Sequence, residues 1–253
     1  MASATRWTRT SSFEPLTRMQ LIGVDGCGAG WVLAIGDTGL GSLDFAIERD
    51  FTGLARLAGA GQALIAIDIP IGLAETGPRA CDLAARLLLG RPRSSSVFAA
   101  PCRPTLSATT YLDACAINLA ACGKAVTKQL YNIMPKIRQV DALMTPGLQT
   151  WVREVHPEVV FAALAGVGQG LGSRKRTPAG EDERLELLAR WLPRVAVGKV
   201  RSCLGPQHAA RDDIVDALAC LVSAYRICRG QHLVLPSGRV PLDSRGLRME
   251  ILA

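Results

Sequence analysis

The chain has 253 residues, of which 49% are hydrophobic and 20% charged, and its formal net charge is +7. This composition is typical of a globular protein and excludes an intrinsically disordered or collagen-like chain. It contains no uninterrupted apolar run of about 18 residues, so no membrane-spanning helix is expected. The basic surplus is compatible with a nucleic-acid partner, although many basic proteins bind none.

Short apolar segments separated by glycine-rich turns form the first part of the chain. Residues 21–25, 31–36 and 43–48 are expected to form three strands of an antiparallel meander, followed by a short helix over 51–60. The continuous apolar run ALIAIDI at 63–69 predicts a fourth strand that is buried on both faces of a mixed or parallel sheet.

A helical region follows the fourth expected strand. Helices are expected over 79–90, 107–122 and about 126–144, with a polar, proline-rich loop at 91–104. Together they form a helical insertion over about 74–148.

The chain after the insertion is expected to contain the last strand of the sheet and several helices. The remaining expected elements are a fifth strand at 151–156, a helix at 157–165, a mobile loop at 166–180, a helix at 181–192, a long helix at about 212–229 and two short terminal strands, HLVLP and LRMEIL.

The order of these elements is that of the ribonuclease H-like fold. We therefore predict an α/β chain with a mixed five-stranded sheet, flanking helices and a helical insertion between strands four and five. Residues 20–253 are expected to form this single domain. Residues 1–19 are rich in Arg, Ser and Thr and lack the apolar core of a signal peptide, so we expect a mobile tail, with a transit peptide as the alternative.

The eight cysteines form no C-x-x-C pair, which argues against a zinc site and a thioredoxin-like motif. Most lie in apolar stretches, where a free cysteine behaves as a small hydrophobic residue. A reducing, cytoplasmic location is therefore expected.

Four aspartates are the main candidates for a functional site. Asp25 ends the first expected strand and Asp68 ends the fourth, so their carboxylates can converge at one edge of the sheet. Asp213 and Asp216 are three apart and share one face of the long helix, whereas Asp212 is interpreted as its N-cap. The alternative is structural, because acidic residues are common in first helical turns and in turns before glycine.

A stripe of small residues on the long helix supports the same site. Ala217, Cys220 and Ala224 would let this helix approach the sheet closely and bring its two aspartates toward the strand ends. Carboxylate ligands without Cys or His suit Mg²⁺ or Mn²⁺. Because two such ions about 4 Å apart can clamp a phosphodiester, the predicted activity is that of a metal-dependent nuclease.

The segment REVHPEVVF adds a second group of candidates. Glu154 and His156 are two apart on an expected strand and face the same side. Glu154 or Glu158 could extend the metal site, and His156 could orient a water molecule or a phosphate. Alternatively, His156 caps the following helix and Glu158 interacts with its dipole. Both interpretations stay open.

Basic residues are scattered around two polar segments. Arg79, Arg91, Arg93 and Arg103 surround SSSVF, and Arg174, Lys175 and Arg176 form a cluster in the later loop. The candidates for contact with substrate phosphate are Arg79, Arg93, Ser95, Arg103 and Lys175. Solvated loops are an equally good explanation, and with only 5% aromatic residues no stacking platform for single strands is evident.

Several long segments of the chain resemble a known family. They are GVDGCGAGWVLA, AIDIPIGL, GPRACDLAARLLLGRPRSSSVFAAP, KQLYNIMPKIRQVD, EVHPEVVFAAL and DDIVDALACLVSA. In this order they are similar to domain-of-unknown-function family 429, from about residue 20 to the end. That family is described as a predicted nuclease with a ribonuclease H-like fold, so the resemblance implies that fold and that activity.

The segment DIVDALA at 213–219 also resembles the last helix of Holliday-junction resolvases of the same fold. By that similarity Asp25, Asp68, Asp213 and Asp216 would take the places of the metal ligands. The fourth strand of those resolvases ends in Glu, whereas here it ends in Asp68, which has a shorter side chain.

Two other classes of function compete with the nuclease. A phosphotransferase or ATPase of the actin and sugar-kinase type grips phosphates with an Asp-Gly hairpin, but it needs two copies of the fold. A non-catalytic interaction module on the same fold is the third hypothesis. A dinucleotide site is excluded because GCGAG at 26–30 is not G-x-G-x-x-G and a strand follows it. The oligomeric state stays open, with a homodimer as one option.

Overall fold

The computed structural model describes residues 6–7, 19–166 and 171–253. The tail expected at 1–19 therefore lies outside the described residues, except for Met19 and a two-residue strand, β1 (Arg6–Trp7).

The central sheet is mixed, as predicted. Its main strands are β2 (Gln20–Cys27), β3 (Gly30–Gly36), β4 (Asp44–Glu48), β5 (Ala63–Ile67) and β6 (Val152–Glu154). They lie in the order β4-β3-β2-β5-β6, and β1 extends the edge at β4. The pairs β2–β3 and β3–β4 are antiparallel, whereas β5 runs parallel to both β2 and β6. This order and these directions confirm the ribonuclease H-like fold.

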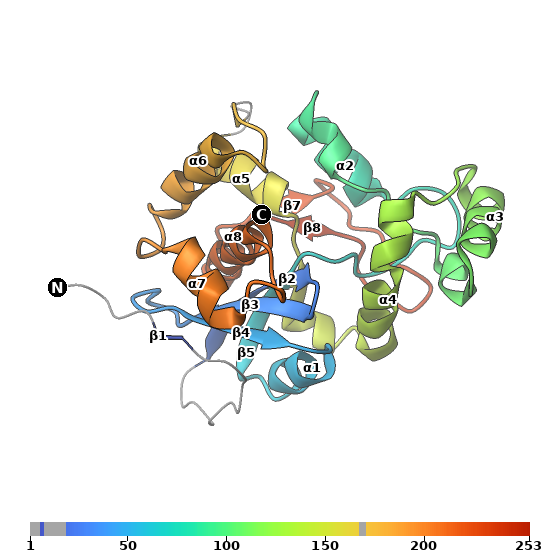
Figure 1. Ribbon diagram of the computed structural model, residues 1–253. Coiled ribbons are helices and arrows are strands. Elements are labelled where there is room, and N and C mark those ends of the chain that lie inside the picture. Colours follow the sequence, from blue (N-terminus) through green and yellow to red (C-terminus); the bar gives the residue numbers. More distant parts are fainter. Residues whose placement is uncertain (1–5, 8–18, 167–170) are drawn as a thin grey trace.

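Helices cover both faces of the sheet (Figure 1). They are α1 (Thr52–Gly59), α2 (Ala80–Leu89), α3 (Tyr111–Cys122), α4 (Lys128–Leu143), α5 (Pro157–Ala165), α6 (Pro178–Leu188), α7 (Val197–Leu204) and α8 (Arg211–Cys228). Helix α7, which has only 8 residues, was not predicted from the sequence. Helix α6 begins three residues earlier than the expected helix at 181–192, because Thr177 caps it by accepting a hydrogen bond from the Gly180 amide.

The helical insertion lies between β5 and β6, as the sequence analysis expected. It comprises α2, α3 and α4 together with three short 3-10 helices, η1 (Arg93–Ser96), η2 (Arg103–Ser107) and η3 (Leu148–Thr150). Figure 1 shows α3 and α4 on the opposite side of the molecule from α6 and α7. The terminal strands β7 (Val234–Leu235) and β8 (Ile251–Leu252) pair with each other as a separate antiparallel sheet.

The long helix α8 packs directly on the backbone of β2. A Cβ atom at Gly23 would lie 2.1 Å from the carbonyl oxygen of Ala217 and 2.1 Å from the amide nitrogen of Leu221. The small residues on α8 thus meet a glycine on the sheet, and this close approach brings the start of α8 to the end of β2. On the other face, α1 and α4 cover a second apolar core.

The N-terminus of α8 differs from the expectation. Ala210 is the N-cap residue, so the interpretation of Asp212 as the cap is wrong. Instead, the Asp213 carboxylate accepts a hydrogen bond of 2.8 Å from the Ala210 amide. No helix among the described residues is both long and apolar enough to cross a bilayer.

Candidate active site

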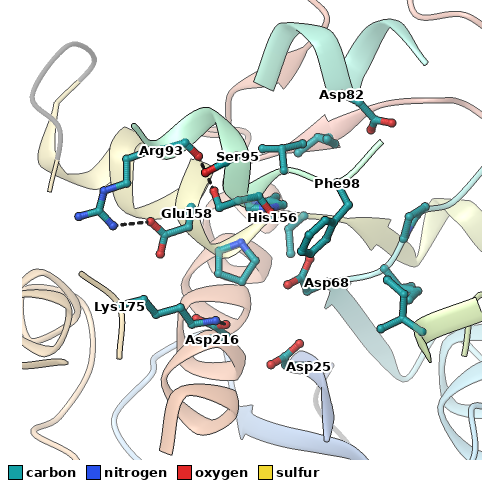
Figure 2. Close-up of a pocket in the computed structure, with 18 of the residues that line it drawn as sticks. Asp25, Asp68, Asp82, Arg93, Ser95, Phe98, His156, Glu158, Lys175 and Asp216 are labelled. Atoms are coloured by element: carbon teal, nitrogen blue, oxygen red, sulfur yellow. Dashed lines mark hydrogen bonds and ion pairs between the residues drawn. The ribbon is translucent and has the colours of Figure 1, made fainter. Parts of the chain in front are cut away.

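A cavity of about 890 Å³ lies at the edge of the sheet where β2 and β5 end. Asp25 from β2, Asp68 after β5 and Asp216 from α8 line it together with parts of the insertion and the segment 171–176. Figure 2 shows the three carboxylates in the same region of the cavity, with Lys175 on the side of Asp216. Three of the four predicted metal ligands are therefore brought together.

The strand ends fix two of these carboxylates. The Asp68 amide donates a 3.0 Å hydrogen bond to the Val24 carbonyl, so the chain after β5 stays paired to β2 beside Asp25. The Asp25 carboxylate accepts a 2.7 Å hydrogen bond from the Gly26 amide. Parallel pairing thus brings the two aspartates together where β5 ends. Asp25 itself does not end its strand as expected, because β2 continues to Cys27.

The third carboxylate, Asp216, forms an ion pair with Lys175. Asp216 is 2% exposed, and its Oδ2 atom accepts a hydrogen bond from Lys175 Nζ. Its Oδ1 atom is buried and has no hydrogen-bond partner in the described ranges. One ammonium therefore faces three carboxylates, and the ionised cluster has a net negative charge.

Burial and mutual repulsion disfavour this negative charge. Burial raises the pKa of Asp25 well above its ordinary value, and the neighbouring carboxylates of Asp216 and Asp68 raise it further. Burial also raises the pKa of Asp68, against the opposing effect of His156. The pKa of Asp216 is raised to about 7, again mainly by burial, although Lys175 acts in the opposite direction. The cluster therefore favours binding of protons or another cation.

The donor set fits a hard divalent cation in its chemistry. All three side chains offer carboxylate oxygens, and Asp216 Oδ1 is a buried acceptor with no described partner. No group of three or more His, Cys, Asp or Glu side chains is assembled closely enough to hold an ion in the part of the chain that is described. Asp25, Asp68 and Asp216 could therefore be ligands only if they drew closer around the ion.

The raised pKa of Asp216 gives a prediction for stability. A carboxyl group whose pKa is raised in the folded state contributes stability below its ordinary pKa, and this contribution is lost as the pH rises through about 7. Without divalent ions, this contribution should therefore make the free energy of unfolding fall between about pH 4 and 7. Urea unfolding in a chelator measures this fall, and Asp216→Asn should make it shallower. An equal fall in both proteins would contradict the assignment.

Asp213 does not line the cavity. One of its carboxylate oxygens caps the Ala210 amide at the start of α8. Its carboxylate still interacts electrostatically with Lys175 and contributes to the raised pKa of Asp25. Three of the four predicted ligands therefore line the cavity, and the observed contact of Asp213 is the helix cap.

Glu154 and Arg79 line the cavity, but each is occupied by a buried ion pair. Arg79 is 3% exposed and binds both oxygens of Glu154, at 2.7 and 2.8 Å, and both oxygens of Asp82, at 2.6 and 3.3 Å. It also donates to the carbonyls of Ile71 and Gly72. The predictions of a metal ligand at Glu154 and a phosphate contact at Arg79 do not fit this closed network.

His156 and Glu158 both line the cavity. His156 Nε2 lies 3.3 Å from the Ser96 carbonyl, and Nδ1 is buried with no described partner. His156 is the N-cap residue of α5 and Glu158 lies in its first turn, as the alternative expected, although the His156 side chain makes no capping hydrogen bond. Glu158 binds Arg93 and the buried Arg184, and it is therefore held within an ion-pair network.

The other phosphate candidates separate into two groups. Arg93, Ser95 and Lys175 line the cavity, whereas Arg103 does not and pairs instead with Asp141 and Asp243. Even within the cavity, Arg93 already donates to Glu158 and to two backbone carbonyls, and Ser95 donates to the Pro92 carbonyl.

Two residues that line the cavity were not predicted from the sequence as site residues. Lys136 of α4 donates a 2.6 Å hydrogen bond to the Gly30 carbonyl and lies 4.9 Å from the centre of the Trp31 ring. Phe98 lines the cavity from the loop after η1. Lys136 could have been suspected from its position beside the apolar face of an expected helix. Phe98 could have been suspected because it is an aromatic residue in an otherwise polar loop.

The fold and this site define an α/β protein of the ribonuclease H-like class with a buried carboxylate cluster at the edge of its sheet. The chain belongs to the family described as "Protein of unknown function (DUF429)", whose profile matches residues 23–240. No curated protein and no solved structure matches the chain. The family match confirms the resemblance seen in the sequence, and it assigns no activity.

Proposed function

We propose that this protein is a divalent-metal-dependent nuclease that hydrolyses phosphodiester bonds of DNA or RNA. The observation that carries the proposal is the convergence of Asp25, Asp68 and Asp216 in one cavity of a ribonuclease H-like sheet. Their negative charge exceeds that of the nearby ammonium, and their oxygen atoms suit Mg²⁺ or Mn²⁺.

Each group of residues has a distinct role in this proposal. A bound divalent ion supplies Lewis acidity and lowers the pKa of a water molecule. Asp25, Asp68 and Asp216 would hold it, and the burial of Asp25 and Asp216 limits screening of the interaction by bulk water. Arg174 and Arg176 are exposed at the cavity and can contact the phosphates that flank the scissile bond.

The direct test is cleavage of a broad panel of labelled nucleic acids with Mg²⁺ or Mn²⁺. The panel includes single strands, duplexes and branched junctions of both DNA and RNA. We expect Asp68→Asn and Asp216→Asn to lower cleavage at least about 100-fold, because each removes a charged ligand. Asp213→Asn and the control Asp37→Asn, which lies outside the cavity, should keep activity within about threefold. Absence of cleavage and of Mn²⁺ binding would favour the non-catalytic module.

Lys175 provides a second test that needs no substrate. Its ammonium is bound to Asp216 and would repel a divalent ion held by the same carboxylate. Replacing Lys175 by methionine should therefore raise the affinity for Mn²⁺ about tenfold, as measured by isothermal titration calorimetry. Lys124→Met, an exposed change outside the cavity, is the matched control. Unchanged or weaker affinity of the Lys175 variant would mean that the two cations do not compete.

A further inference from the structure

The cavity contains an aromatic ring that neither hydrophobic core uses. Phe98 is half-buried and lines the cavity with Asp68, yet it is absent from both clusters of packed apolar side chains. In Figure 2 its side chain points into the cavity, on the side of Asp68 rather than that of Lys175. The face of the ring is thus available to a ligand that reaches the carboxylates.

The backbone on either side of Phe98 is held firmly. Val97 is 1% exposed, and its carbonyl accepts a 2.9 Å hydrogen bond from Arg86 Nε. The Ala100 amide donates a 2.9 Å hydrogen bond to the buried carboxylate of Asp82. Since the neighbours are anchored to α2, the phenyl ring is presented at a fixed place. Such pre-organisation lowers the entropic cost of binding a planar group.

The lining of the cavity combines apolar, acidic and basic side chains. Besides Phe98, the apolar residues Ile69, Pro70 and Ile133 line it, and the segment 174–176 supplies three basic residues. The carboxylates of Asp25, Asp68 and Asp216 line the same cavity. A ligand that matches this lining has a flat, largely apolar part and a phosphate part, with the reacting centre between them. A nucleotide has this composition.

We propose that Phe98 stacks on an unpaired nucleobase next to the scissile phosphate, so that the substrate is single-stranded or locally unpaired nucleic acid. This inference rests on the proposed nuclease function and specifies its substrate class. Every base has a π-face, so stacking on one ring gives affinity without sequence preference. In a continuous duplex both faces of each base are covered by its neighbours, and Phe98 has no face to contact.

The test measures binding of the full chain in Ca²⁺, which limits cleavage, to fluorescein-labelled oligonucleotides. The probes are a mixed-sequence single strand, its duplex, and the same strand with abasic sites. We expect the wild type to prefer the single strand to the other two by about tenfold or more. Phe98→Ala should lose this preference by weakening only single-strand binding, and Phe98→Trp should restore it.

Leu87→Ala is the matched control, because it also shortens an apolar side chain. Leu87 lies on α2, is 85% exposed and is outside the cavity. This variant should bind all three probes like the wild type. Thermal unfolding of each variant checks the fold. If Phe98→Ala binds single strands as tightly as the wild type does, or if abasic sites have no effect, the stacking role is overturned while the nuclease proposal stands. If the wild type binds none of the three probes, the single-strand proposal is overturned, and cleavage of the broader panel decides whether the nuclease proposal stands.

Discussion

Replacing Gly23 by alanine is expected to lower the free energy of unfolding by about 3 kcal/mol or more. The added Cβ would lie 2.1 Å from two backbone atoms of α8, at Ala217 and Leu221. Backbone atoms cannot rotate out of the way as a flexible side chain can, so α8 would have to move away from β2. Chemical denaturation of the variant and the wild type measures the difference.

The same substitution should also disturb the site. Asp216 is adjacent to Ala217 on α8, and Asp25 lies two residues after Gly23 on β2. A shift of the helix would therefore separate two carboxylates of the cluster, and Mn²⁺ binding should weaken with stability. Gly59→Ala is the matched control, because a Cβ there meets nothing within 4 Å in helix α1. It should be neutral or stabilising by up to about 1 kcal/mol. A Gly23 variant as stable as this control would show that α8 tolerates the displacement.

The apolar pattern of the strands was enough to predict the two carboxylates of the site that come from the sheet. Asp25 and Asp68 were identified because each follows an apolar strand, and parallel pairing of β2 with β5 brings such ends together. The spacing of three placed Asp213 and Asp216 on one helix face, yet only Asp216 enters the cavity. The difference comes from the helix boundary, since α8 begins at Arg211 and Asp213 is left to cap the first turn.

Contacts between distant segments could not be predicted in this way. Arg79 and Glu154 are separated by 75 positions, and nothing in either local pattern indicates that they bind each other. The same holds for Lys175 and Asp216, which are 41 positions apart. A charged residue that binds a substrate cannot be distinguished in the sequence from one that is neutralised by an ion pair. Only the fold shows that Glu154 is paired and that Asp216 keeps an unpartnered oxygen.

The buried pair gives the second large prediction. Arg79→Met should lower the free energy of unfolding by about 3–5 kcal/mol, because it leaves the Asp82 and Glu154 carboxylates buried without their cation. It also removes the donors to the carbonyls of Ile71 and Gly72, in the segment that follows Asp68. Arg176→Met is the control, because the Arg176 side chain is 84% exposed. It should change the free energy of unfolding by less than about 1 kcal/mol.

The dependence of this loss on pH identifies its cause. Burial raises the pKa of Glu154 to about 7 even though Arg79 opposes the shift, and removing Arg79 should raise it further. A carboxyl group with a raised folded pKa stabilises the fold at low pH and loses that contribution as the pH rises through its pKa. The Arg79→Met defect should therefore be larger at about pH 8 than at about pH 5, and adding Glu154→Gln should recover part of it. A defect that is equal at both pH values and insensitive to Glu154→Gln would mean that lost packing, rather than uncompensated charge, destabilises the variant.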